Sequence, residues 1–298
     1  MYGNAASPRP GRARRPPEAP VRRAGFAPGA RKGYHGGMRN TRAAFLSLAV
    51  VVALCGAAAA SFPAFVGDAG DSAPSLPRVA RRIAEGGDLR IVAFGSSSTQ
   101  GVGASSPARS YPARLESTLR SALPGLAGKV VVLNRGIGGE DVDDMLLRVD
   151  RDVIAAAPDL VIWQTGSNDP MRKVPLEHFR EATAAAVARM RGAGLDVMLM
   201  EPQWCPRLEA EPGSARFRDA VRDIARDLGI PVLRRSDLMR EWVSESRIDR
   251  KDLFAPDGLH MADGGYDLLA KSTADEILRG ADAMDGETGE AAAVAVEQ

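Results

Sequence analysis

A regular alternation of short apolar runs and longer amphipathic stretches, which begins near residue 89, constrains the fold more than any other feature. Runs with the length and aliphatic content of buried strands cover residues 89–94, 129–133, 160–164, 196–200 and 230–233. Helical patterns cover residues 111–123, 141–156, 175–193, 215–228 and 266–279. Five strands that alternate with helices predict an α/β domain in which helices cover both faces of a parallel sheet.

Charge is distributed unevenly along the chain. Residues 1–42 contain ten of the 39 Lys and Arg but only one of the 38 Asp and Glu. This basic head therefore has a net charge of +9, and the rest of the chain has a net charge of −8. The head is rich in Pro, Gly and Arg and is expected to be disordered; if translation starts at Met38, most of it is not part of the protein. The acidic body argues against a nucleic-acid partner, because binding a phosphate backbone requires a basic face.

An uncharged and largely apolar segment, residues 43–66, follows the basic head. The basic run 38–42 precedes it, and three alanines lie within it at 58–60, as in a signal peptide. The segment is also long enough to cross a bilayer as an uncleaved anchor. A lipoprotein site at Cys55 is disfavoured because Leu54 is not small. The sequence therefore predicts export, either to the periplasm or extracellular space or to a membrane with the folded domain outside.

Two further segments flank the alternating region. Residues 67–88 are polar and are predicted to form a linker. Residues 280–298 are rich in Ala, Gly and Glu and are predicted to be a disordered tail. The folded domain is therefore expected to span residues 89–279.

Only three histidines occur, which narrows the search for a general base. His35 lies in the basic head, and His178 lies between charged residues near a helix start, where a solvated side chain is expected. His260 lies on a Pro- and Gly-containing loop before the last helix, three residues after Asp257. Asp257 could be a turn residue, since Asp-Gly is typical of turns, or it could orient His260 as a base.

A Gly- and Ser-rich loop, residues 95–101, follows the first strand. It could be a flexible connection, or it could present a serine nucleophile, which requires an adjacent base held by a third group. The sequence contains no G-x-S-x-G motif, so the α/β-hydrolase fold is disfavoured. It also contains no G-x-x-x-x-G-K-[ST] motif for cradling phosphates.

Glycine and polar residues also follow the second strand, at 134–139, and the third, at 166–169. Because ligands bind at the carboxyl ends of parallel strands, these loops should converge on one site. Asp141 replaces the last glycine of the dinucleotide fingerprint, and Glu140 would place an acid at the pyrophosphate, so that function is disfavoured. A metal site formed by the acids at 140–144 is less plausible than acids that complement a helix dipole.

The four loop motifs, in this order at these strand ends, resemble those of the SGNH or GDSL hydrolases. GSSST at 95–99 resembles the G-D-S-L-T block, and NRGIGG at 134–139 resembles the glycine block. GSND at 166–169 matches G-x-N-D, and DGLH at 257–260 matches D-x-x-H. The resemblance covers residues 89–279 and implies a three-layer α/β/α, flavodoxin-like fold with a five-stranded parallel sheet.

The resemblance also implies roles for individual residues. Ser97 is the implied nucleophile, His260 the base and Asp257 the residue that orients it. The backbone N–H groups of Ser97 and Gly139 and the side chain of Asn168 are the implied oxyanion donors. Ser96 replaces the aspartate of the family's first block, which lies outside the triad. This change leaves the register open to Ser96 or Ser98, although alignment on Gly95 and Thr99 favours Ser97.

The implied function is hydrolysis of acyl or acetyl esters of carbohydrates or lipids through an acyl-enzyme, without a metal or organic cofactor. Three alternatives remain: an acyltransferase that uses the same triad on a cell-envelope sugar, a non-catalytic carbohydrate- or lipid-binding module, and a flavodoxin-like nucleotide-binding protein. The complete set of triad and oxyanion residues disfavours the second, and the acidic glycine loop disfavours the third.

Overall fold

The computed structural model describes residues 75–126 and 128–296, with side chains up to Asp282. The basic head, the apolar segment 43–66 and the first part of the expected linker lie outside the described residues. Within the described ranges, no helix is both long and apolar enough to cross a membrane.

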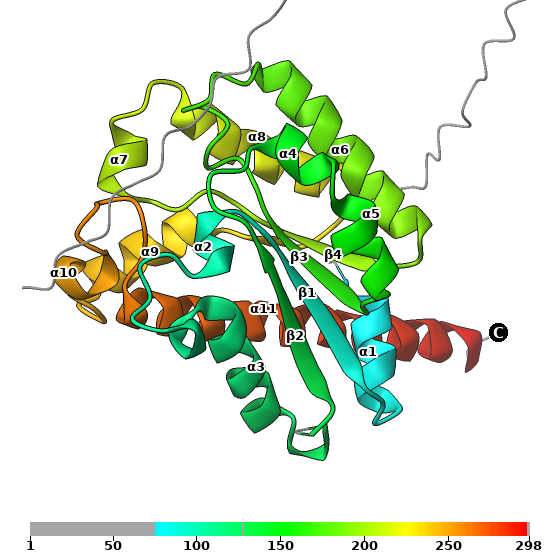
Figure 1. Cartoon of the computed structure of the whole chain (residues 1–298). Coiled ribbons are helices and arrows are strands. Elements are labelled where there is room, and N and C mark those ends of the chain that lie inside the picture. The colour runs from blue at the N-terminus through cyan, green and yellow to red at the C-terminus, as the bar shows by residue number, and fades with distance from the viewer. Residues whose placement is uncertain (1–74, 127, 297–298) are drawn as a thin grey trace, which may run out of the picture. The chain divides into compact units, whose positions relative to one another are not determined.

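Five parallel strands form one sheet in the order β2-β1-β3-β4-β5 (Figure 1). Their bounds are Leu89–Gly95 (β1), Val130–Gly136 (β2), Leu160–Gln164 (β3), Asp196–Met200 (β4) and Val232–Leu233 (β5). The predicted parallel sheet is confirmed, and β3 and β4 have the predicted bounds. The last strand is shorter than the predicted 230–233, and Pro231, which lacks an N–H for the ladder, directly precedes it.

Helices cover both faces of the sheet, as predicted. One face packs against α1 (Pro77–Ala84), α3 (Tyr111–Ala122), α9 (Arg235–Ser244) and α11 (Asp263–Val296). The other packs against α4 (Val142–Leu146), α5 (Val149–Asp152), α6 (Leu176–Gly192) and α8 (Ser214–Asp227). The central strand β1 shows how the pattern builds both cores, because Ile91 and Ala93 lie in one and Val92 and Phe94 in the other.

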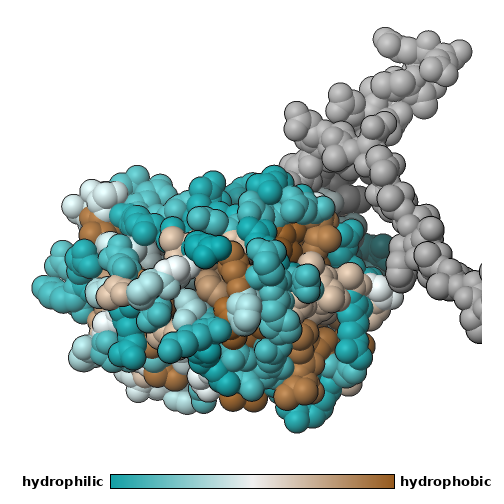
Figure 2. Space-filling model, turned by 90° about the horizontal axis from the view of Figure 1, so that it is seen from above, coloured by the Kyte–Doolittle hydropathy of each residue, from teal (hydrophilic) through white to brown (hydrophobic). Residues whose placement is uncertain are grey.

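Three further short helices lie in loops, after β1, after β4 and between α9 and α11. They are α2 (Ser97–Gln100), α7 (Pro206–Glu209) and α10 (Arg250–Leu253). Seen from above, the surface is largely hydrophilic, with apolar side chains in small patches (Figure 2).

Both predicted domain boundaries require correction. Part of the expected linker forms α1, whose Val79 is buried together with the preceding Leu76. Ala80 and Ile83 also pack against the core, and Asp196 accepts the first backbone N–H groups of the helix, so α1 is attached to the domain by apolar and polar contacts. At the other end, the segment predicted to be a disordered tail is helical: α11 extends to Val296, because Ala and Glu have high helix propensity.

Two helix predictions also differ from the structure. The single helix predicted at 141–156 is divided into α4, α5 and a short 3₁₀ turn, Ile154–Ala156, with a non-helical Arg148 between the first two. Helix α9 was not predicted, although it buries Met239 and Trp242.

Candidate active site

The loops after β1, β2 and β3 meet because glycines allow their backbones to approach closely. A Cβ atom on Gly136 would lie 2.0 Å from the backbone nitrogen of Gln100 in α2, and one on Gly95 would lie 2.4 Å from Thr99 Oγ1. Any side chain at these two positions would therefore displace the loop that carries Ser97. The close approach explains why glycines end both strands.

Ser97, His260 and Asp257 form a continuous hydrogen-bonded chain. The distance from Ser97 Oγ to His260 Nε2 is 2.8 Å, and that from His260 Nδ1 to Asp257 Oδ2 is 2.6 Å. The other carboxylate oxygen of Asp257 accepts the backbone N–H groups of Leu259 and His260, both at 2.9 Å. Although partial burial opposes ionisation, the hydrogen bonds from His260 and Leu259 lower the pKa of Asp257 to about 2.

This geometry assigns the proton on the imidazole. An ionised Asp257 carboxylate can only accept a hydrogen bond, so Nδ1 of His260 is protonated and its N–H donates a hydrogen bond to Asp257. His260 Nε2 is then free to accept the Ser97 hydroxyl proton. This arrangement is the one that a serine nucleophile requires.

The structure also distinguishes the three consecutive serines. Ser96 and Ser98 are 1% and 2% exposed, whereas Ser97 is partly exposed. Ser96 Oγ donates to Gln164 Oε1 at 3.1 Å, on the side away from solvent. Of the three hydroxyls, the one on Ser97 is hydrogen-bonded to His260.

Gly139 and Asn168, the expected oxyanion donors, lie on neighbouring loops. Gly139 is exposed and has a φ of +83°, which favours glycine. Asn168 Nδ2 donates one N–H to the carbonyl of Glu140 at 2.7 Å, and its second N–H is available. A Cβ on Gly138 would lie 3.7 Å from Ser97 Cβ, so the glycine loop borders the nucleophile.

Arg148, which the sequence interpretation missed, connects these loops through hydrogen bonds and ion pairs. Its buried guanidinium donates to the carbonyls of Gly95 at 3.0 Å and Arg135 at 2.9 Å. It also forms ion pairs with Glu140 at 2.5 Å and Asp152 at 3.1 Å. The last residue of β1, the glycine loop and α5 are thereby connected by one side chain.

A second missed feature is a chain of buried polar side chains between the loop that carries Ser97 and the loop that carries His260. Gln164 Oε1 accepts from the Ser96 backbone, and Gln164 Nε2 donates to Ser167 Oγ at 3.1 Å. Ser167 Oγ donates to Gln203 Oε1 at 3.0 Å, and Gln203 Nε2 donates to the carbonyl of Leu259 at 3.2 Å. The only local signal was a glutamine at the end of a strand that is otherwise apolar.

The acids that could have suggested a metal site have other partners. Asp141 accepts the backbone N–H of Asp144 as the N-cap of α4 and pairs with Arg172 at 2.8 Å. Asp143 lies 2.7 Å from the exposed His178, which has the solvated position expected for it. The helix-terminus interpretation of this cluster therefore agrees with its contacts.

Asp169 differs from these acids because it is fully buried. Its Oδ1 accepts the backbone N–H of Val142 at 2.9 Å, whereas its Oδ2 has no hydrogen-bond partner among the described residues. Burial raises the pKa of Asp169 to about 6, despite the hydrogen bonds from Val142 and other backbone groups.

Comparisons with known proteins agree with this fold. Residues 62–283 match the Non-GDSL lipase-like family. The Uncharacterized lipoprotein YqeF of Bacillus subtilis (strain 168) is 25% identical over 224 residues, covering 63% of this chain and 90% of the relative. A lipase/acylhydrolase from Enterococcus faecalis is 24% identical, with a TM-score of 0.52 over 63% of this chain and 95% of that one.

The acetyl xylan esterase AlAXEase is 21% identical, with a TM-score of 0.54 over 63% of this chain and 100% of that one. At these identities the two solved structures establish the fold alone. The family match covers most of the chain, including every loop of the candidate site. The chain therefore belongs to the Non-GDSL lipase-like family, among the SGNH/GDSL-like lipolytic hydrolases.

Proposed function

We propose that the chain is a serine esterase in which Ser97 is the nucleophile, His260 the general base and acid, and Asp257 the residue that orients His260. The observation that carries this proposal is the unbroken chain of hydrogen bonds from Ser97 to Asp257, at 2.8 and 2.6 Å. A serine hydroxyl near neutral pH is a weak nucleophile, so it requires a base and an orienting group.

The proposed reaction has two steps. In the first, His260 Nε2 takes the hydroxyl proton as Ser97 Oγ bonds to the ester carbonyl carbon, and the resulting imidazolium gives that proton to the leaving alcohol as its C–O bond breaks. In the second, His260 removes a proton from water as the water oxygen attacks the acyl carbon, and the imidazolium returns that proton to Ser97 Oγ as the C–Oγ bond breaks, which releases the acid. Asp257, with its pKa near 2, remains ionised throughout.

The oxyanion of each tetrahedral intermediate is proposed to accept from the N–H groups of Ser97 and Gly139 and from the Asn168 amide. Support comes from the second N–H of Asn168, which its bond to Glu140 leaves available, and from the glycine loop beside Ser97. Such fixed donors stabilise charge that develops only in the transition state.

The proposed substrate is an acyl or acetyl ester of a carbohydrate or lipid, with an acetylated sugar as the first candidate. A solved structure of the same fold is an acetyl xylan esterase. Two exposed apolar side chains, Val102 and Ile137, lie on segments whose backbone N–H groups bond to Ser97 O and Gly95 O. They provide an apolar surface for the acyl group beside the nucleophile.

We also propose that the protein is exported through its apolar segment, residues 43–66. The curated relative is named a lipoprotein, which is consistent with export of this chain. Immunoblotting of the culture medium, membrane and cytosol would test this, and a full-length product confined to the cytosol would contradict it.

A panel of chromogenic esters, graded from acetyl to long acyl, tests the proposed activity. We expect turnover that falls with acyl length and disappears in Ser97→Ala. Acyl transfer to an added sugar that outpaces hydrolysis would make the protein an acyltransferase. Binding of acetylated sugars without turnover of any ester would favour the binding module.

A further inference from the structure

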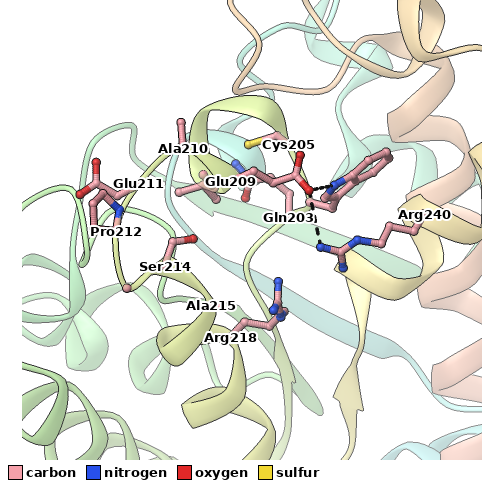
Figure 3. A pocket seen from close by; sticks show the side chains of 13 residues that line it. Gln203, Cys205, Glu209, Ala210, Glu211, Pro212, Ser214, Ala215, Arg218 and Arg240 are labelled. Carbon is pink, nitrogen blue, oxygen red and sulfur yellow. Dashed lines mark hydrogen bonds and ion pairs between the residues drawn. The ribbon is translucent and has the colours of Figure 1, made fainter.

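A cavity of about 440 Å³ is lined by residues of α7, α8, α9 and the segments that flank α7 (Figure 3). Its size is within the range of about 300–1,000 Å³ that is typical of small-molecule sites. Its lining includes charged side chains from three segments: Glu209 at the end of α7 with Glu211 just after it, Arg218 on α8 and Arg240 on α9. The proposed active site uses none of them.

The two arginines of this cavity have unusually loose ion pairs. Arg218 lies 3.8 Å from Asp219, and its side chain is only 23% exposed. Arg240, which is 42% exposed, lies 3.8 Å from Glu209 and 3.9 Å from Asp237, and its guanidinium is 5.6 Å from the centroid of the Trp204 ring. These distances exceed those of hydrogen bonds. By contrast, Arg222, on the same helix as Arg218, contacts Glu201 at 2.5 Å.

Both guanidinium groups point into the same space (Figure 3). Arg218 extends from α8, and Arg240 reaches across from α9. Glu209 is already engaged by the indole N–H of Trp204 at 2.5 Å, and Glu211 lies on the far side of the cavity from the guanidinium groups. Among the described residues, neither guanidinium has a carboxylate at hydrogen-bond distance, and the carboxylates around Arg240 lie 3.8 and 3.9 Å away.

This lining determines what kind of chemical group the cavity can hold. A hydrocarbon acyl chain would desolvate the charged side chains without replacing their hydrogen bonds, which is costly. A carboxylate or phosphate could accept from both guanidinium groups, which bind these anions in fork geometry. The carboxylates of Glu209 and Glu211 can accept from hydroxyl groups beside the anion. The lining therefore matches a sugar that carries a negative charge.

Hydrogen bonds connect the lining of the cavity to the loop that carries the proposed base. Gln203 lines the cavity and donates to the carbonyl of Leu259, the residue before His260. The backbone N–H of Arg207, in α7, donates to the carbonyl of Gly258 at 3.2 Å. Gln203 and α7 therefore separate a ligand in the cavity from the loop that carries the proposed base.

We propose that this cavity binds an anionic sugar unit on the alcohol side of the ester, with Arg218 and Arg240 as the residues that recognise its negative charge. This inference rests on the proposed esterase function for its kinetic consequence. Binding itself does not depend on catalysis.

The kinetic test compares an acetylated neutral sugar with an acetylated uronic acid. The wild type should favour the uronic acid in kcat/KM by about tenfold or more, as expected for a charge-assisted hydrogen bond. Arg218→Gln and Arg240→Gln should each remove this preference, through a rise in KM for the uronic acid ester. Arg216→Gln, on the exposed side of α8, is the matched control and should retain the preference. Equal kcat/KM values for the two esters in the wild type would overturn the proposal.

A binding test separates this inference from the esterase proposal. Trp204 lines the cavity, whereas Trp163 and Trp242 are fully buried, so indole fluorescence of Ser97→Ala should report binding. Glucuronate or glucose 1-phosphate, but not glucose, should change it, and the stronger of the two identifies carboxylate or phosphate as the natural group. Loss of this response in Arg218→Gln would support the site even if no ester were hydrolysed. No response to either anion would overturn it, whatever the esterase assay showed.

Discussion

The loop that carries Ser97 is fixed among buried polar groups, whereas the loop that carries Asp257 and His260 lies at the surface. Gln164 is fully buried beneath Ser96 and Thr99, and it accepts hydrogen bonds from both. The side chains of Asp257 and His260 are 47% and 12% exposed. One half of the site is thus positioned by burial, and the other by a short turn with its own hydrogen bonds.

The pKa values of Asp169 and Asp257 differ in the same way as the burial of the two loops. Burial raises the pKa of Asp169, on the nucleophile side, to about 6. On the base side, partial burial also opposes ionisation, but the hydrogen bonds from His260 and Leu259 outweigh it and lower the pKa of Asp257 to about 2. The ionised form of an aspartate is therefore disfavoured at position 169 and favoured at position 257. This difference places the permanent negative charge next to the imidazole.

Replacement of the base should give the largest effect. His260→Ala removes the group that we propose accepts the Ser97 proton, so we expect kcat to fall by roughly 10⁴–10⁶-fold. His178→Ala, on the exposed start of α6, is the control and should retain activity. Steady-state hydrolysis of an acetyl ester measures both, and equal losses would remove His260 from its assigned role.

Removal of the proposed oxyanion amide should have a smaller effect. Asn168→Ala should lower kcat by about 10²–10³-fold with little change in KM, because the lost hydrogen bond forms mainly in the transition state. Michaelis–Menten kinetics on the same ester separates the two constants. A change confined to KM would instead indicate that Asn168 binds the ground-state substrate.

The connection between the two halves can be tested at Gln203. Gln203→Glu keeps the acceptor for Ser167 but removes the donor to the carbonyl of Leu259. We expect kcat to fall by about tenfold, roughly the effect of one hydrogen bond, because the base loop loses its attachment. If Gln203 positions the proposed base, the substitution should also change the pH dependence of kcat/KM. If Gln203 only stabilises the fold, the substitution should lower the melting temperature and leave the pH dependence unchanged.

The buried carboxylate of Asp169 should affect stability rather than rate. Its pKa of about 6 in the folded protein exceeds the ordinary value of about 3.9, so the folded state binds the proton more tightly. Unfolding free energy should therefore rise, relative to Asp169→Asn, as pH falls from about 7 to 4. The expected gain is on the order of 2–3 kcal/mol. Urea titrations at several pH values measure it, and parallel curves for the two proteins would contradict the assigned shift.

Local sequence patterns predicted the parts of this protein that depend on near neighbours. The apolar runs gave β3 and β4 at their observed bounds, and the glycines at 95 and 136 marked loops that approach closely. The contacts of Gln164 could not be predicted in this way, because its partner Ser96 lies 68 residues away. The same holds for Arg148, which bonds to Gly95 across 53 residues. Helix α1 was missed because only a few of its residues face the core.

Covalent labelling tests the central claim most directly. A serine-reactive phosphonate should modify the wild type, and peptide mapping by mass spectrometry should place the adduct on Ser97, whose hydroxyl is bonded to His260. Ser97→Ala should abolish both labelling and ester turnover, whereas Ser96→Ala should retain both, since Ser96 bonds to Gln164 instead. An adduct on Ser96 or Ser98, or persistent turnover in Ser97→Ala, would contradict the assignment of Ser97 as the nucleophile.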